Sequence, residues 1–284
     1  MLALPNRLNL SIGHSCFVRC AGCYSKFGRT APDLARFELS VARFVECGIR
    51  AVTVSGGDPL RIPGLVQFLG RLRAVGIESI KVDTVGTALL PGSAERVPLA
   101  DLLDAADIVG LPLDGWSEQS VRWFREGRPR LFGETLEIIE AVRQADARCD
   151  LYLNTVLHRL NVTDASRILD IVRGLEIVRR WNIFQYTPTD QARSEVNDRL
   201  AISDATFTSA ARQLRAAAGG HGVEIECASV RDRVGKYLLV NSAGDAWMPD
   251  IDGRTVPLGN VCGREREVLL AWRDVSEELT CLVR

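Results

Sequence analysis

The feature of this chain that most constrains its fold is a repeated alternation of short apolar runs with amphipathic stretches. Most of the apolar runs are nearly continuous, which predicts strands covered on both faces. The predicted strands are 8–13, 51–55, 79–84, 108–113, 150–156 and 181–187. The amphipathic stretches with helical spacing are 33–47, 135–142, 165–175 and 204–218. Strict alternation implies an α/β protein with a parallel sheet, either an open doubly wound sheet or a partial barrel. Both forms place their chemistry at the carboxyl ends of the strands.

The pattern changes after Gly220. Residues 223–228 and 237–241 predict strands, and Ser242 to Asp245 form a good hairpin turn. A length of 284 residues fits one large domain with a small appendage. We therefore expect a core over residues 1–220 and a C-terminal α+β extension over residues 221–284.

Charge and hydropathy exclude several classes of partner. The chain has 35 basic and 36 acidic side chains, so its net charge of −1 offers no footprint for nucleic acid. No apolar run approaches the roughly 18 residues of a membrane span, and the first residues lack the pattern of a signal peptide. The eight cysteines are unevenly spaced, which favours a metal or cluster site over disulfides. We expect a cytoplasmic protein with no nucleic-acid or membrane partner.

Three of the cysteines, Cys16, Cys20 and Cys23, lie on one loop directly after the first predicted strand. Three thiolates at this spacing can bind one metal centre, and Gly22 lets the backbone fold closely around it. A structural zinc site would require a fourth ligand, for which His14 is available. A [4Fe–4S] cluster has four irons, so three cysteines leave one iron free for another ligand. Three buried thiols without metal are the remaining alternative.

The C-x3-C-x2-C spacing, followed by the aromatic Tyr24, resembles the signature of the radical S-adenosylmethionine (radical SAM) superfamily. The resemblance implies a partial (βα)6 TIM barrel, a [4Fe–4S] cluster held by the three cysteines, and SAM as cofactor with Tyr24 beside it. Gly56, Gly57 and Asp58 follow the second strand and resemble the family motif that binds the SAM amino group, with Asp in place of the commoner Glu.

Further positions match the family's SAM site. Arg125 matches the arginine that pairs with the SAM carboxylate, although Arg128 and Arg130 are close enough to compete for that role. The likeness is greatest to the branch that includes MoaA, PqqE and viperin. That pattern implies that the remaining contacts, to ribose and adenine, come from Asn154, Val156, Gln185 and Tyr186.

The chain also departs from this pattern. Viperin has phosphate-binding lysines at the positions of Tyr152 and Asn182, so we do not expect a triphosphate substrate. The extension resembles a degenerate SPASM or twitch domain, which in relatives holds auxiliary clusters. Its three cysteines, Cys227, Cys262 and Cys281, form no C-x2-C pair, so we expect a single cluster.

The resemblance implies an enzyme that reductively cleaves SAM to a 5′-deoxyadenosyl radical, which removes hydrogen from a substrate. We expect a small-molecule biosynthetic intermediate such as a sugar, nucleoside or amino-acid derivative, contacted by Tyr186, Cys227 and Arg159. A reductase such as flavodoxin or ferredoxin would supply electrons. A ribosomally made peptide is the alternative substrate, and a non-catalytic zinc- or cluster-binding regulatory module is the alternative class. The sequence identifies neither the net reaction nor a catalytic acid, base or hydrogen donor.

Overall fold

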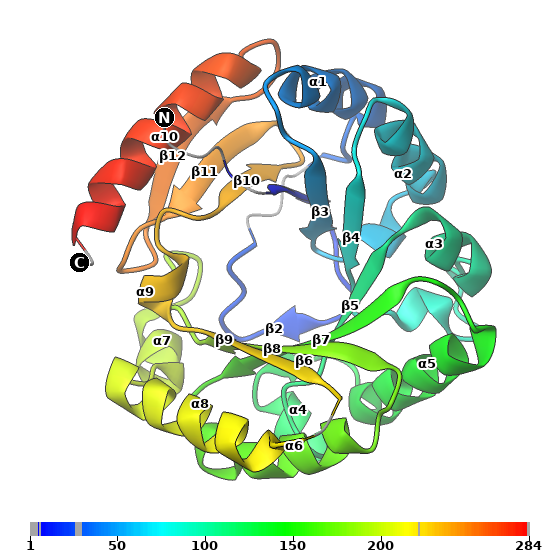
Figure 1. Cartoon of the computed structure of the whole chain (residues 1–284), viewed down its shortest axis with the longest axis vertical. Coiled ribbons are helices and arrows are strands. Elements are labelled where there is room, and N and C mark those ends of the chain that lie inside the picture. Colours follow the sequence, from blue (N-terminus) through cyan, green and yellow to red (C-terminus); the bar gives the residue numbers. More distant parts are fainter. Residues whose placement is uncertain (1–4, 6, 26–29, 221, 283–284) are drawn as a thin grey trace.

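The computed structural model describes residues 5, 7–25, 30–220 and 222–282. They form a ring of strands with helices on its outside (Figure 1). The main sheet has the order β12-β11-β10-β1-β3-β4-β5-β7-β8-β9. Its strands are β1 (Leu8–Gly13), β3 (Ala51–Gly56), β4 (Ser79–Asp83), β5 (Ile108–Pro112), β7 (Asp150–Leu157), β8 (Val178–Gln185), β9 (Glu224–Ala228), β10 (Leu238–Asn241), β11 (Asp245–Pro249) and β12 (Thr255–Asn260). A second, two-stranded sheet pairs β2 (Arg19–Cys20) with β6 (Arg125–Glu126).

Every neighbouring pair from β10 to β9 is parallel, whereas β10, β11 and β12 are joined by antiparallel pairs. This topology confirms the predicted α/β fold, a partial barrel with C-terminal hairpins. The six predicted strands correspond to β1, β3, β4, β5, β7 and β8.

The helices lie on the outside of the ring, around the strands (Figure 1). They are α1 (Leu34–Glu46), α2 (Leu65–Ala74), α3 (Leu99–Ala105), α4 (Glu118–Arg122), α5 (Leu131–Ala145), α6 (Ala165–Arg173), α7 (Ser194–Leu200), α8 (Asp204–Ala218), α9 (Val230–Arg233) and α10 (Glu265–Leu282). In α1, Phe37, Val41 and Phe44 are buried, and Asp33 caps the first turn by accepting a hydrogen bond from the Arg36 N–H.

Side chains alternate along each barrel strand between the helix layer and the interior of the ring, which we call the lumen. In β7 every second residue is fully buried, Leu151 and Leu153 among them, while Tyr152, Asn154 and Val156 are only partly covered. The lumen-facing positions are therefore where polar residues interrupt the apolar runs.

The segment after Gly220 contributes to both edges of the main sheet. Strand β9 pairs with β8, and β10 pairs with β1 at the other edge, with α9 between them in the chain (Figure 1). The β11–β12 turn reaches the segment after β8, because a Cβ at Gly253 would lie 1.6 Å from the Pro188 carbonyl oxygen. The C-terminal residues thus bridge the open side of the ring.

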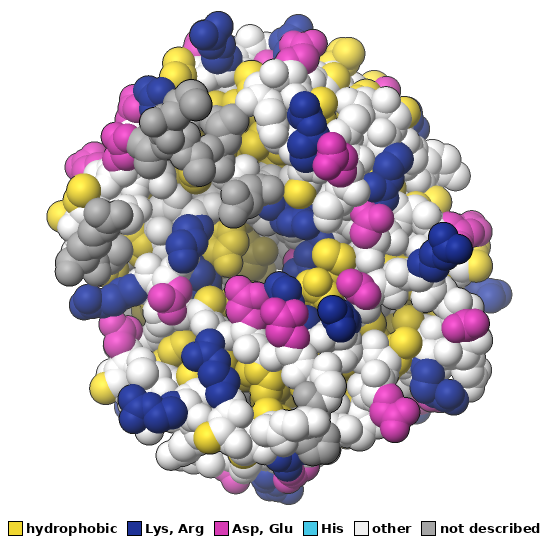
Figure 2. All heavy atoms as spheres, in the orientation of Figure 1, with side chains coloured by type: hydrophobic (Ala, Val, Ile, Leu, Met, Phe, Trp, Pro, Cys, Tyr) yellow, Lys and Arg dark blue, Asp and Glu magenta, His cyan; other side chains and the backbone are white. Residues whose placement is uncertain are grey.

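The face shown in Figure 2 is hollowed near its centre, inside the ring of strands, and its acidic and basic side chains are interspersed. This mixture agrees with the net charge of −1. Among the described residues, no helix combines the length and the apolar character needed to cross a bilayer.

Candidate active site

The three cysteines lie on the loop that follows β1, residues 16–23, which we call the cysteine loop. Its middle is pinned by the small second sheet, in which Cys20 is paired with Arg125. The Ala21 N–H also donates to the Phe124 carbonyl at 2.8 Å. Two segments about a hundred positions apart in the chain therefore hold the loop in place.

The thiols of the cysteine loop act on one another electrostatically. Burial raises the pKa of Cys16 to about 11 and that of Cys23 to about 12, and in both the charge of Cys20 raises it further. Hydrogen bonds from the backbone N–H groups of Val18 to Cys16 and of Ser25 to Cys23 act in the opposite direction. Burial therefore favours the neutral thiol at both positions, and each would become a thiolate only when a metal centre compensates that burial.

This donor set fits a multi-iron cluster better than a zinc ion. Among the described residues, no three Cys, His, Asp or Glu side chains are close enough to bind one metal ion. Ligands of a four-iron cluster bind different irons, so they need not converge on one point. His14 has a buried Nδ1 without a hydrogen-bond partner in the described part of the chain, but it joins no such group.

Arg125 lies between a carboxylate and a thiol. Its Nε donates to Asp114 Oδ2, and its Nη1 donates to Cys20 Sγ at 3.2 Å. Asp114 is fully buried, and its other oxygen accepts from the Val156 N–H at 2.7 Å. Burial lowers the pKa of Arg125, but the charge and hydrogen bond of Asp114 and the charges of Cys20 and Cys16 together raise it more, so the guanidinium stays cationic. Within the described residues its Nη2 makes no hydrogen bond, so the expected contact with a ligand carboxylate stays a prediction that this geometry allows.

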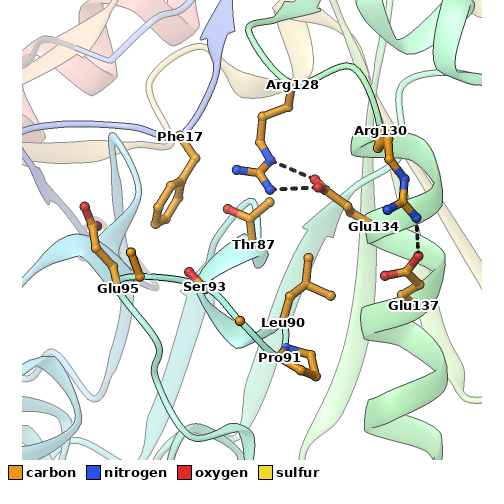
Figure 3. A pocket seen from close by; sticks show the side chains of 12 residues that line it. Phe17, Thr87, Leu90, Pro91, Ser93, Glu95, Arg128, Arg130, Glu134 and Glu137 are labelled. Atoms are coloured by element: carbon orange, nitrogen blue, oxygen red, sulfur yellow. Dashed lines mark hydrogen bonds and ion pairs between the residues drawn. The ribbon is translucent and has the colours of Figure 1, made fainter.

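The two competing arginines are turned elsewhere. Figure 3 shows Arg128 and Arg130 beside a cavity of about 410 Å³ that Phe17 also lines. Arg128 donates twice to Glu134, at 2.7 Å each, and Arg130 donates to Glu137 at 2.8 Å. Their charges are thus compensated by carboxylates of helix α5, whereas Arg125 is paired with Asp114 and keeps its Nη2 without a hydrogen bond to the described residues.

The Gly56–Asp58 turn packs directly against residues 13–15, which lead into the cysteine loop. Gly57 N–H donates to the Gly13 carbonyl at 2.9 Å, and Asp58 N–H donates to the Ser15 carbonyl at 2.7 Å. Gly56 has φ of +124°, and a Cβ there would lie 2.4 Å from the Gly13 nitrogen. Only glycine fits this position, because both the backbone conformation and the space exclude a side chain.

The Asp58 carboxylate is fully buried and already bonded. It accepts hydrogen bonds from Thr84 Oγ1 at 2.7 Å, Leu60 N–H at 3.0 Å and Val85 N–H at 2.8 Å. Burial raises its pKa to about 6 despite these bonds. The carboxylate therefore ties the β3 and β4 ends together, and the predicted contact with the SAM amino group falls to the backbone carbonyls of the turn.

Asn154 belongs to a chain of polar side chains across the lumen. Its Nδ2 donates to Asp83 Oδ1 at 2.9 Å, and its Oδ1 accepts from Asn182 Nδ2 at 2.9 Å. Asp83 also pairs with Lys81 at 3.0 Å. Tyr24 lies within electrostatic range of Asp83, and 48% of the residue is exposed. The structure thus gathers Asn154 and Tyr24 at the lumen, where a ribose or adenine contact stays a prediction.

Gln185 and Tyr186 differ from the expected arrangement. Gln185 lies on the outward face of β8, where Nε2 donates to the Ile202 carbonyl at 3.1 Å and Oε1 accepts from the Val230 N–H at 2.9 Å. Strand alternation is the reason, because Asn182 points inward three positions earlier. Only the backbone of Gln185 can therefore line an adenine site.

Tyr186 is buried beneath the cysteine loop, with 2% of the residue exposed. A Cβ at Gly22 would lie 2.2 Å from its Oη, and this hydroxyl donates to Asn197 Oδ1 at 2.7 Å. Val156 packs on the same small core. The Tyr186 ring therefore supports the cysteine loop, and its predicted role toward adenine or substrate is limited to its backbone.

The three cysteines after Gly220 lie on separate elements. Cys227 is on β9, Cys262 follows β12, and Cys281 is exposed on α10.

Tyr152 lies under two cations, with Lys81 Nζ 5.8 Å and the Arg180 guanidinium 5.1 Å from its ring centre. Arg159 donates to the Ala201 carbonyl at 3.3 Å and is largely exposed.

Sequence reasoning gave no role to Asp114 or Asp83, which hold Arg125 and Asn154. Asp114 had a signal, because it stands in a Leu-Asp-Gly segment at a strand end, where functional residues of such folds gather. Asp83, at the end of β4, had the same positional signal.

A partial barrel with three cysteines on the loop after its first strand defines a class of enzymes that bind an iron–sulfur cluster at the carboxyl ends of the strands. The family model described as the radical SAM superfamily matches residues 10–172. The chain belongs to this superfamily, which implies a [4Fe–4S] cluster and SAM, and the resemblance seen in the sequence is confirmed.

The curated relatives of this radical SAM chain are GTP 3′,8-cyclases, to which it is homologous. The enzyme of Heliobacterium modesticaldum is 33% identical over 114 residues, which are 38% of this chain and 33% of the relative. That of Xanthomonas campestris pv. campestris (strain 8004) is 28% identical over 240 residues, 76% of this chain and 69% of the relative. The chain spans only 33% of the Heliobacterium enzyme and 49% and 43% of two other relatives, less than half of each.

Solved structures support the fold. Native anSMEcpe with bound AdoMet superposes with a TM-score of 0.69 at 14% identity, covering 98% of this chain and 83% of that one. SuiB of Streptococcus suis bound to S-adenosylmethionine gives a TM-score of 0.67 at 12% identity, covering 86% and 60%.

Proposed function

We propose that this protein reductively cleaves SAM and removes a hydrogen atom from a small-molecule biosynthetic intermediate bound in the lumen. The observation that best supports this proposal is the hydrogen bonding of the Gly56–Asp58 turn to Gly13 and Ser15, just before the cysteine loop. This contact supports binding of the SAM amino group next to the cluster. When bound, the cluster supplies the electron for SAM cleavage.

The chain's own residues would position the cofactor. Cys16, Cys20 and Cys23 would hold the cluster, and the Arg125 Nη2 is available for the SAM carboxylate. Asn154 would bind the ribose, and Val156 with the backbone of residues 185–186 would line the adenine. Tyr24 would cover the cofactor from the lumen side. The buried Asp114 keeps the Arg125 side chain in this position without changing its charge.

The polar chain in the lumen supports a small substrate. Lys81, Asp83, Asn154 and Asn182 offer hydrogen bonds inside the ring rather than on an open surface. The β11–β12 turn packs at Pro188, beside the end of β8. A compact polar molecule suits this enclosure, and Tyr152 and Asn182 in place of lysines disfavour a triphosphate.

A peptide is the second candidate substrate. It is favoured by the solved neighbours, since SuiB has been seen bound to its precursor peptide SuiA and anSMEcpe with AdoMet and a Cp18Cys peptide. Saturable binding of a fluorescent peptide encoded beside the gene, dependent on SAM, would establish this alternative. We further propose a single cluster and electron supply by a flavodoxin or ferredoxin.

The test is anaerobic reconstitution followed by iron and sulfide analysis and by reduction in the presence of SAM. The wild type should bind about four irons per chain and release methionine from SAM. Joint replacement of Cys16, Cys20 and Cys23 by Ala should abolish both. The matched control, Ala at Cys227, Cys262 and Cys281, should leave both unchanged. Activity that survives the first triple change, or one zinc without iron and sulfide, would overturn the proposal.

A further inference from the structure

Arg233, the last residue of α9, is fixed at the end of β8 by neutral acceptors. Its Nε donates to the Ser229 carbonyl at 3.1 Å, and its Nη2 donates to Thr187 Oγ1 at 2.7 Å and to the Gln185 carbonyl. The guanidinium carbon also lies 5.7 Å from the centre of the Phe184 ring. Because Phe184 and Asn182 share the inward face of β8, this contact places the guanidinium at the lumen.

The charge of Arg233 has no counter-ion in the described part of the chain. No carboxylate there pairs with it, and Asp232, its neighbour in sequence, is bonded to Ser229 instead. Arg231, on the same helix, pairs with Asp204 at 2.9 Å and is exposed. Arg233 is partly buried, and burial lowers its pKa although the charges of Tyr237, Asp232 and Tyr24 act in the opposite direction. A guanidinium that is desolvated and uncompensated can be stabilised by an anion from outside the chain.

Two hydrogen-bond donors of Arg233 remain for such an anion. Arginine has five N–H groups, and the three bonds above use those on Nε and Nη2. The two on Nη1 make no hydrogen bond within the described residues. Three anchors hold the side chain still, so little rotamer entropy would be lost on binding.

The position of Arg233 connects it with the proposed cofactor site. The phenols of Tyr24 and Tyr237 both lie within electrostatic range of its charge. Tyr24 follows Cys23 directly, and 48% of it is exposed, so it borders open space. Arg233 therefore faces the same part of the lumen as the residue that closes the cysteine motif, and it comes from the C-terminal extension.

We propose that Arg233 binds one anionic group of the substrate, a carboxylate or a phosphate monoester, and so holds the molecule in the lumen. This inference rests on the proposed function and narrows its substrate to a small molecule with such a group. A single unpaired guanidinium matches one oxyanion, whereas a triphosphate would require several cations. Tyr24 and Tyr237, whose hydroxyls can donate hydrogen bonds, lie within electrostatic range of it.

The test measures anion binding by thermal unfolding of the reconstituted protein. The probes are succinate and inorganic phosphate at constant ionic strength, with succinamide as the neutral counterpart of succinate. The wild type should be stabilised in a saturable way by at least one anion and not by succinamide. The anion with the lower half-saturation concentration identifies the chemical group. Arg233→Gln should raise that concentration at least about tenfold, which corresponds to about 1.4 kcal/mol.

Arg231→Gln is the matched control, because it removes a cation two positions away that is already paired; it should bind like the wild type. Arg233→Lys keeps the charge and should lose less anion affinity than the Gln variant. If Arg233→Gln does not fold, the comparison of Arg233→Lys with the wild type serves as the test. The inference would be overturned if the Arg233 variants bound the anion as well as the wild type does. It would also be overturned if Arg231→Gln lost as much anion affinity as Arg233→Gln, or if no anion stabilised the wild type specifically. Iron content and SAM cleavage are recorded separately, so a failure of the proposed function is seen independently of anion binding.

Discussion

Replacing Gly22 by Ala should dislodge the cysteine loop from its support. The new Cβ would lie 2.2 Å from Tyr186 Oη and 2.3 Å from Cε2, so loop and ring must separate by more than 1 Å to reach ordinary contact. The ring cannot retreat freely, since it is 2% exposed and its hydroxyl is bonded to Asn197 at 2.7 Å.

The magnitude follows from these two constraints. Overpacking a filled core costs about 1–3 kcal/mol, and loss of the hydroxyl bond adds about 0.5–1.5 kcal/mol. We therefore expect Gly22→Ala to lower the free energy of unfolding by about 2–4 kcal/mol in urea titrations, and to lower the iron content after reconstitution. Gly70→Ala is the matched control, because nothing lies within 4 Å of a Cβ there and α2 should gain up to about 1 kcal/mol.

A double variant distinguishes this contact from a general effect of the methyl group. Tyr186→Leu is destabilising by itself, but it removes the ring atoms that the added methyl group would strike. Adding Gly22→Ala to Tyr186→Leu should then cost at least about 1 kcal/mol less than in the wild type, within the usual range for residues in contact. Wild-type stability and iron content in Gly22→Ala, or strict additivity in the double variant, would refute the reasoning.

Three further changes test other parts of the site. Asp114→Asn removes the charge beside Arg125, whose side chain is 16% exposed, and should cost about 3 kcal/mol in urea unfolding; an unchanged midpoint would contradict this. Burial lowers the pKa of His158 to about 4, so the folded state binds fewer protons than the unfolded state between about pH 4 and 6.5. The free energy of unfolding of the wild type should fall by about 3 kcal/mol as the pH falls over that interval. In His158→Gln this part of the decrease should be absent. Gly253→Ala, with a Cβ 1.6 Å from the Pro188 oxygen, should lift the β11–β12 turn and speed tryptic cleavage there; equal rates would speak against the contact.

Continuous apolar runs predicted the barrel strands closely, as in β1, whose bounds agree in full. Strand β8 begins at Val178 rather than residue 181, because Arg179 and Arg180 interrupt its run although they are part of the ladder. The small β2–β6 sheet could not be predicted, since it joins residues about a hundred positions apart through two-residue strands.

The cysteine spacing predicted the centre of the site, but the orientation of single side chains was less accessible. Asp58 takes its partners Thr84 and Val85 from the next strand end, and no local pattern shows this. The outward direction of Gln185 follows from strand alternation only when the strand start is known. Arg233 stands in a charged stretch of the sequence, and only the fold shows that the groups accepting its hydrogen bonds are neutral.

The place of β1 between β10 and β3 has a consequence for biosynthesis. Asn9 Nδ2 donates to the Leu238 carbonyl across 229 positions, so one edge of β1 stays unpaired until nearly the whole chain has left the ribosome. Pairings of such separation form late, and an unpaired inner strand invites association with other chains. The cysteines follow this strand directly. A nascent or prematurely terminated chain would thus display its three thiols on an unfinished edge, and cluster delivery should be productive only after synthesis is complete.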